Sequence, residues 1–207
     1  MSSSKFRKRR QRKNKSNSKK IILIVSLLAV AVTIIVGYSM LGNNNSNENN
    51  PEEITSMKVL LETSMGKITI QLRDNMPITT ENFKNLVQQG VYDSTIFHRV
   101  MSDFMIQGGD PNGNGMSDDG IPTIPDEFMD NNNNNRGTIA MANAGANTGS
   151  SQFFINVINN NYLDDAHPVF GEVISGMDVV DAISNVETDT NDRPIGAVTI
   201  IRAQLID

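Results

Sequence analysis

Residues 21–41 (IILIVSLLAVAVTIIVGYSML) form an apolar run that contains no Asp, Glu, Lys or Arg. As an α-helix rising 1.5 Å per residue, the run would be about 31 Å long, close to the roughly 30 Å hydrocarbon core of a bilayer. Inside a bilayer a single segment satisfies its backbone polar groups only as a helix. The run therefore predicts one transmembrane helix. A buried core helix is the weaker interpretation, because the run is long and lies between two polar segments.

The charge distribution gives this helix a direction. Residues 1–20 hold ten of the 18 Lys and Arg residues and none of the 23 acids. Because basic flanks stay on the cytoplasmic side, we expect a single-pass membrane protein with a cytoplasmic N-terminus and an extracytoplasmic body. Beside a membrane span, the basic arm is read as a topology signal that contacts anionic lipid, so no nucleic-acid partner is expected.

A cleaved signal peptide is the main alternative to a retained anchor. Against it, the run exceeds the usual 7–15 apolar residues, and no clean A-x-A site follows it. Residues 42–55 are polar and rich in Asn, and they predict a flexible spacer. Residues 56–207 are then left to form one folded domain, expected to be a monomer.

Composition removes several kinds of chemistry from this domain. The chain has no Cys, which excludes disulfides, thiolate catalysis and Cys-ligated zinc, and its two His residues cannot form a three-His zinc site. The segment that starts at Asp110, with Asn112 and Asn114, resembles the beginning of an EF-hand calcium loop. Ile121 stands at the position where such a loop needs a bidentate Glu. Neither a metal nor a cofactor is expected.

Short alternating segments predict a mainly β domain. Eight of them are strand candidates, at residues 58–63, 67–73, 95–100, 104–107, 138–142, 153–157, 169–173 and 198–205. Two segments have helical spacing instead. One is 77–89, with Pro at its start and Gly90 after it, and the other is 177–184. Eight modest strands favour a barrel or a sandwich.

Four motifs then identify a family. They are FHRV at 97–100, FMIQGGD at 104–110, MANA at 141–144 running on to SQFF at 151–154, and YL at 162–163 with HPVF at 167–170. With these four motifs in this order, the sequence from 57 to 207 resembles the cyclophilin family of peptidyl-prolyl cis-trans isomerases. The resemblance implies a closed eight-stranded antiparallel barrel capped by two helices, with a substrate groove on its outer face, here preceded by the transmembrane helix.

Isomerisation of an X–Pro bond requires no transfer of a chemical group. The barrier of about 18–20 kcal/mol comes from amide resonance, while the cis and trans forms differ by only about 0.5–1 kcal/mol. No nucleophile, metal or nucleotide is needed. An apolar pocket for the proline ring and a donor that favours the twisted amide are enough, since each 1.36 kcal/mol of preference gives about tenfold in rate.

The resemblance assigns these roles to particular residues. Arg99 is implied as the donor, with Gln107 holding it and His98 as a positioning group. The residues implied for the proline pocket are Phe104, Met105, Phe154 and Leu163, with Met101 and His167 at the rim. Those implied to dock the flanking peptide are Gln152, Ala142, Asn143 and Ala144. Tyr162 stands where many members carry Trp, which puts cyclosporin affinity in doubt.

The implied activity is rotation about X–Pro bonds in unfolded or exported proteins, assisting their folding outside the cytoplasm. The alternative is a non-catalytic module that binds proline peptides. The intact set of Arg99, Gln107 and Phe154 favours the enzyme.

Overall fold

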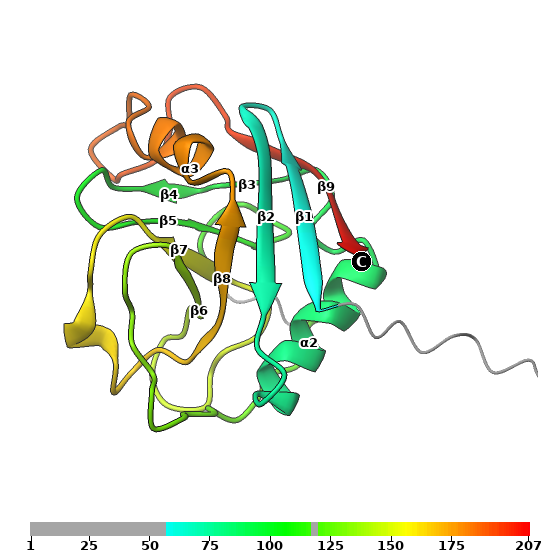
Figure 1. The fold of residues 1–207 in the computed structure, drawn as a ribbon. Coiled ribbons are helices and arrows are strands. Elements are labelled where there is room, and N and C mark those ends of the chain that lie inside the picture. Colours follow the sequence, from blue (N-terminus) through cyan, green and yellow to red (C-terminus); the bar gives the residue numbers. More distant parts are fainter. Residues whose placement is uncertain (1–56, 117–119) are drawn as a thin grey trace, which may run out of the picture. The chain divides into compact units, whose positions relative to one another are not determined.

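The computed structural model describes residues 57–116 and 120–207 (Figure 1). The predicted arm at 1–20, the span at 21–41 and the spacer at 42–55 lie outside these residues. In the described part of the chain, no helix combines the length and the apolar character that a membrane crossing requires.

The described residues form one curled antiparallel sheet with two α-helices and a short 3-10 turn. The strands are β1 (Lys58–Thr63), β2 (Gly66–Leu72), β3 (Thr95–Ile96), β4 (Arg99–Val100), β5 (Met105–Gly108), β6 (Thr138–Met141), β7 (Phe153–Asn156), β8 (Val169–Ser175) and β9 (Thr199–Ile206). The helices are α2 (Pro77–Gln88), α3 (Met177–Ser184) and the 3-10 turn η1 (Asn161–Leu163). The strand order in the sheet is β3-β9-β1-β2-β8-β6-β7-β5-β4.

This order corrects the predicted closed eight-stranded barrel. The predicted strand at 95–100 is two short strands, β3 and β4, and they stand at opposite ends of a nine-stranded sheet. Only Phe97 and His98 separate them, so the sheet must curl until its ends approach each other. Within the described residues, a single bridge between Ile96 and Asp110 links β3 to the segment after β5, and no ladder closes the sheet. The result is a half-barrel.

Helix α2 begins where the sequence predicts and packs on the main core. Proline occupies its first turn, where the missing N–H costs no hydrogen bond. The Glu127 carboxylate, from a distant loop, accepts hydrogen bonds from the N–H groups of Ile78 (3.1 Å) and Thr79 (2.9 Å). Gly90, at φ +71°, follows the helix and donates to the Val87 carbonyl, which ends it by the mechanism that the sequence suggests.

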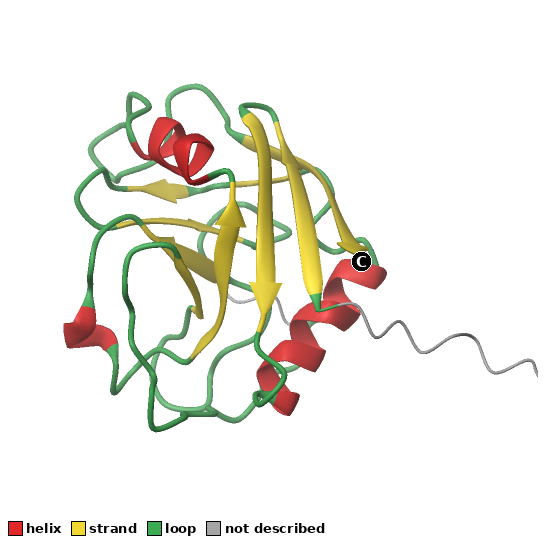
Figure 2. Ribbon diagram, in the orientation of Figure 1, coloured by secondary structure: helices red, strands yellow, loops and turns green. Residues whose placement is uncertain are grey.

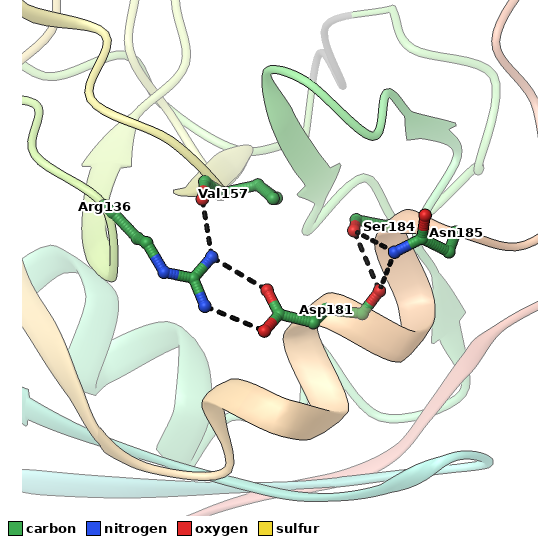
Figure 3. A network of polar contacts seen from close by, with 5 residues as sticks. All are labelled: Arg136, Val157, Asp181, Ser184 and Asn185. Atoms are coloured by element: carbon green, nitrogen blue, oxygen red, sulfur yellow. Dashed lines mark hydrogen bonds and ion pairs between the residues drawn. The ribbon is translucent and has the colours of Figure 1, made fainter.

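Helix α3 is fixed to the sheet by one charged network (Figure 3). The Arg136 guanidinium donates to both carboxylate oxygens of Asp181 (2.8 and 2.7 Å) and to the Val157 carbonyl (2.6 Å). This pair lowers the pKa of Asp181 and raises that of Arg136. At the helix end, Ser184 and Asn185 donate to the Asp181 carbonyl. Figure 2 shows α2 and α3 at opposite ends of the curled sheet, as the resemblance implies.

Candidate functional site

Alternation along β7 separates the main core from a second apolar cluster. Phe153 lies in the main core, while its neighbour Phe154 points to the other side and joins a smaller cluster. The buried members of this cluster are Met105, Ala140, Phe154 and Val169, and the partly buried residues packed against it are Met101, Phe104, Ala142 and Leu163. The structure thus brings together the four residues expected in the proline pocket, with Met101 beside them.

Arg99 lies on β4 at the edge of this smaller cluster. Its guanidinium carbon is 5.9 Å from the centroid of the Phe104 ring. Nη2 donates to Sδ of Met101 at 3.3 Å, and Nε is 3.6 Å from a carboxylate oxygen of Asp192. The side chain is 43% exposed. A cation held this loosely beside an apolar surface can turn its donors toward a ligand carbonyl without first breaking a tight pair.

Gln107 and Gln152 form a hydrogen-bonded pair next to Arg99. The Gln107 amide donates to Oε1 of Gln152 (3.0 Å), and the Gln152 amide donates to the Met116 carbonyl (2.8 Å). Gln107 is the cross-strand partner of Arg99 in the register of β4 and β5. The side-chain hydrogen bond that the structure gives it goes to Gln152 instead of Arg99, whose own polar contacts are with Met101 and Asp192.

A small cavity of about 90 Å³ lies beside this glutamine pair. Its walls include all the residues expected to dock the flanking peptide, which are Gln152, Ala142, Asn143 and Ala144. The Asn143 amide donates to the Ala166 carbonyl at 2.7 Å, and this bond ties the 142–144 segment to the loop before His167. The docking residues therefore lie together around one cavity, which both glutamines border.

The far wall of the apolar cluster comes from η1 and the loop after it. The Tyr162 ring lies nearly parallel to Phe104, with centroids 6.2 Å apart, and remains 74% exposed. The His167 ring meets Phe154 edge-on at 5.3 Å, and its Nδ1 is 3.0 Å from the Met141 carbonyl. When Nδ1 donates to that carbonyl in the neutral ring, Nε2 is the acceptor.

A group of asparagines forms hydrogen bonds near Phe104 and the turn before His167, and none of the four sequence motifs indicates it. Asn160 donates to the Phe104 carbonyl and to Asn156, which in turn donates to Asn134. Asn132 donates to the carbonyls of Asp164 and His167. Four of these side chains are at most 8% exposed: Asn132, Asn134, Asn156 and Asn160. The network supports Phe104 and the turn before His167 from below.

His98 lies between β3 and β4 and is buried, with 7% exposure. Neither of its ring nitrogens has a hydrogen-bond partner. Asp110 holds the adjacent loop, because its carboxylate accepts hydrogen bonds from the N–H groups of Asn112, Asn114 and Gly115. A side chain at Gly115 would stand about 3.5 Å from the His98 ring. His98 therefore packs against the loop that Asp110 holds, and its positioning role in the site stays a prediction.

Burial lowers the pKa of His98 from its ordinary value of 6.5, although Asp110 opposes the shift. The unfolded chain therefore takes up this proton at a higher pH than the folded chain does. The free energy of unfolding should keep its full value above about pH 6.5 and decrease as the pH falls below that value. Urea unfolding at pH 8 and pH 5.5 measures the loss, which His98→Gln should reduce. An equal loss in the variant would assign the pH dependence to other groups.

Comparisons with known proteins show the family to which the chain belongs. The sequence profile of the family described as "Cyclophilin type peptidyl-prolyl cis-trans isomerase/CLD" matches residues 58–205. Peptidyl-prolyl cis-trans isomerase ppi1 of Schizosaccharomyces pombe is 45% identical over 151 residues, which are 70% of this chain and 96% of the relative. The isomerase CYP18-2 of Arabidopsis thaliana is 42% identical over 166 residues, 77% of this chain and 97% of the relative.

A crystal structure gives the same result for the fold. The cyclophilin type peptidyl-prolyl cis-trans isomerase of Cryptosporidium parvum, solved in the presence of the dipeptide Ala-Pro, superposes with a TM-score of 0.69 at 30% identity. The match covers 72% of this chain and 99% of that one.

Proposed function

The chain belongs to the cyclophilin-type peptidyl-prolyl cis-trans isomerase family, and we propose that Arg99 is the residue with which it lowers the barrier to rotation about the X–Pro bond of a substrate. One observation carries the proposal: a half-exposed guanidinium stands 5.9 Å from the Phe104 ring, at the edge of the apolar cluster that contains Met105 and Phe154. A proline ring on that cluster places its amide within reach of the Arg99 guanidinium, whose N–H donors can turn toward it.

The chemistry follows from amide resonance. In the planar amide the nitrogen lone pair is delocalised, and in the twisted transition state it is localised on nitrogen. A donor directed at this part of the substrate binds the twisted form better than the planar one, and only such differential binding raises the rate. The guanidinium is charged at every working pH and offers several N–H groups, so Arg99 can contact the prolyl carbonyl and the nitrogen region.

The peptide before the proline is proposed to lie over the small cavity that Gln107 and Gln152 border. Support comes from the walls of that cavity, which present the 142–144 segment and the Gln152 amide next to the apolar cluster. The likeness to a cyclophilin solved in the presence of Ala-Pro supports the same class of ligand. The test of the assignment is the rate of isomerisation of a short Ala-Pro peptide by the wild-type chain and by Arg99→Ala.

The place of action is proposed from the sequence. An uncharged run at 21–41 behind ten Lys and Arg residues supports a retained anchor with the isomerase outside the cytoplasm. Its substrates would then be proline-containing segments of exported proteins, and a tether would raise the local enzyme concentration where these chains emerge. Proline isomerisation is slow enough to limit folding, so assistance to folding is the natural role.

Fractionation of cells that make the native chain tests the anchor. The full 22.7 kDa protein should sediment with membranes and resist extraction by alkaline carbonate. Protease added outside the membrane should digest the isomerase domain and leave the basic arm protected. A soluble form whose N-terminal sequence starts after residue 41 would show a cleaved signal and overturn the tether.

A further inference from the structure

A second and larger cavity of about 370 Å³ is lined by Val100, the residue that follows Arg99 on β4. Its walls come from the turn between β4 and β5 and from the end of α3 with the loop that follows. The walls that matter here are Met101, Asp103, Phe104, Ser184, Asn185 and Asp192. The site of isomerisation as described so far leaves this volume without a role.

The cavity is continuous with the site. Met101 and Phe104 belong both to its walls and to the residues packed against the smaller apolar cluster. Asp192, another wall residue, is 3.6 Å from Nε of Arg99. The Arg99 guanidinium therefore lies next to a residue of the cavity wall.

The direction of a bound peptide follows from these positions. The segment before the proline is proposed to lie at 142–144, and the prolyl carbonyl is proposed to bind Arg99. The next Cα is only about 3.8 Å farther along the chain, so the following residue must pass Arg99. Its side chain then stands at the mouth of the larger cavity.

The walls of this cavity are held in place. The Val100 N–H donates to the Asp192 carbonyl at 2.8 Å, and Asp192 adopts the left-handed φ of +60° at that bond. On the opposite side, Ser184 and Asn185 are bonded to the Asp181 carbonyl, and Arg136 fixes Asp181 (Figure 3). A cavity with both walls tied down can discriminate between side chains.

The lining also has a definite charge. It contains two carboxylates, Asp103 and Asp192, and no Lys, Arg or His. Asp192 already faces Arg99, whereas Asp103 takes part in none of the ion pairs found among the described residues. Met101 and Phe104 offer apolar surface for the methylene groups of a long side chain whose charged end reaches the carboxylate.

We propose that this cavity binds the side chain of the residue that follows the proline, and that Asp103 makes it prefer Lys or Arg. The inference rests on the proposed function, because the Arg99 contact sets the direction of the peptide. It names the substrate class as peptides with an X–Pro–basic sequence.

The experiment uses the full-length chain in detergent micelles and peptides Ala-Ala-Pro-Xaa, with Lys, norleucine or Glu at Xaa. Exchange NMR gives kcat/KM for each peptide. At low ionic strength we expect the Lys peptide to exceed the norleucine peptide by about threefold to fivefold, the range of one partly exposed ion pair, with the Glu peptide slowest. At 0.5 M salt the ratio should fall toward one because screening weakens exposed pairs.

Asp103→Asn should bring the Lys-to-norleucine ratio below about twofold at low salt. Asp130→Asn is the matched control, because it removes the same charge at an exposed acid outside both cavities and should keep the ratio. An equal loss in both variants would assign the preference to the acidic chain as a whole and overturn the cavity.

A wild-type chain that isomerises all three peptides equally would also overturn the cavity, while leaving the role of Arg99 intact. Full activity of Arg99→Ala on every peptide would instead overturn the proposed role of Arg99, and with it the direction of binding.

Discussion

Arg99→Ala is expected to lower kcat/KM for a short Ala-Pro peptide at least tenfold, with the dissociation constant of the peptide changed less. Tenfold corresponds to about 1.4 kcal/mol of transition-state stabilisation, well within what one charge-assisted donor supplies. Ground-state binding depends mainly on the apolar cluster around Phe154 and Met105, which the substitution leaves in place. Exchange NMR measures the rate, and titration followed by chemical shifts measures the affinity.

Two further variants sharpen this result. Arg99→Lys keeps the charge without the planar fork and should recover only part of the rate. Arg202→Ala removes an exposed guanidinium on β9 and should match the wild type. Equal rates for the wild type and Arg99→Ala would point to a module that binds proline peptides without using this arginine to turn them over.

Phe153→Ala is expected to have the largest effect on stability, a loss of about 3–5 kcal/mol in the free energy of unfolding. The ring is fully buried and meets Phe83 and Tyr92 edge-on, each with centroids 5.5 Å apart. Removing it leaves a cavity in the centre of the main core. Urea unfolding measures the loss, and Phe153→Leu, at about 1–3 kcal/mol, gives a measurable version if the alanine variant does not fold.

The neighbouring residue provides the control. Phe154→Ala deletes the same side chain one position along β7, where it faces the smaller cluster. It should cost less stability than Phe153→Ala, and it should weaken peptide binding, which Phe153→Leu leaves intact. If the two alanine variants lost stability and binding alike, β7 would not separate core from site.

Alternation was a sound guide wherever a strand has one face in the core. The segments predicted at 58–63 and 67–73 correspond to β1 and β2, whose register pairs Leu61 with Ile68. At 95–100 the same rule was wrong. β3 pairs with β9 and β4 pairs with β5, and between them the Phe97 N–H donates to the Val198 carbonyl. The break that splits β3 from β4 depends on this distant partner.

The candidate site, like the fold, was predicted only in part. The resemblance to cyclophilins implies that the apolar residues and Arg99 share one site, and the structure brings them together. Asp192 was not predicted, because Arg99, the residue that it faces, is far away in the sequence and no local motif contains Asp192. In the run at 131–135, five identical residues carry no signal of direction, and only the folded chain turns Asn132 and Asn134 inward. Sequence reasoning finds the residues that meet a ligand more readily than those that support them.

The two strands at the ends of the sheet, β3 and β4, are each two residues long, and this limits how other chains can pair with the sheet. An unfolded chain pairs readily with a long exposed strand edge and can nucleate aggregates there. Here one end of the sheet is β3 and the other is β4, and the Val100 N–H of β4 is already satisfied by the Asp192 carbonyl. The ends of the sheet therefore offer few backbone groups with which another chain could pair, which limits aggregation through the sheet edges.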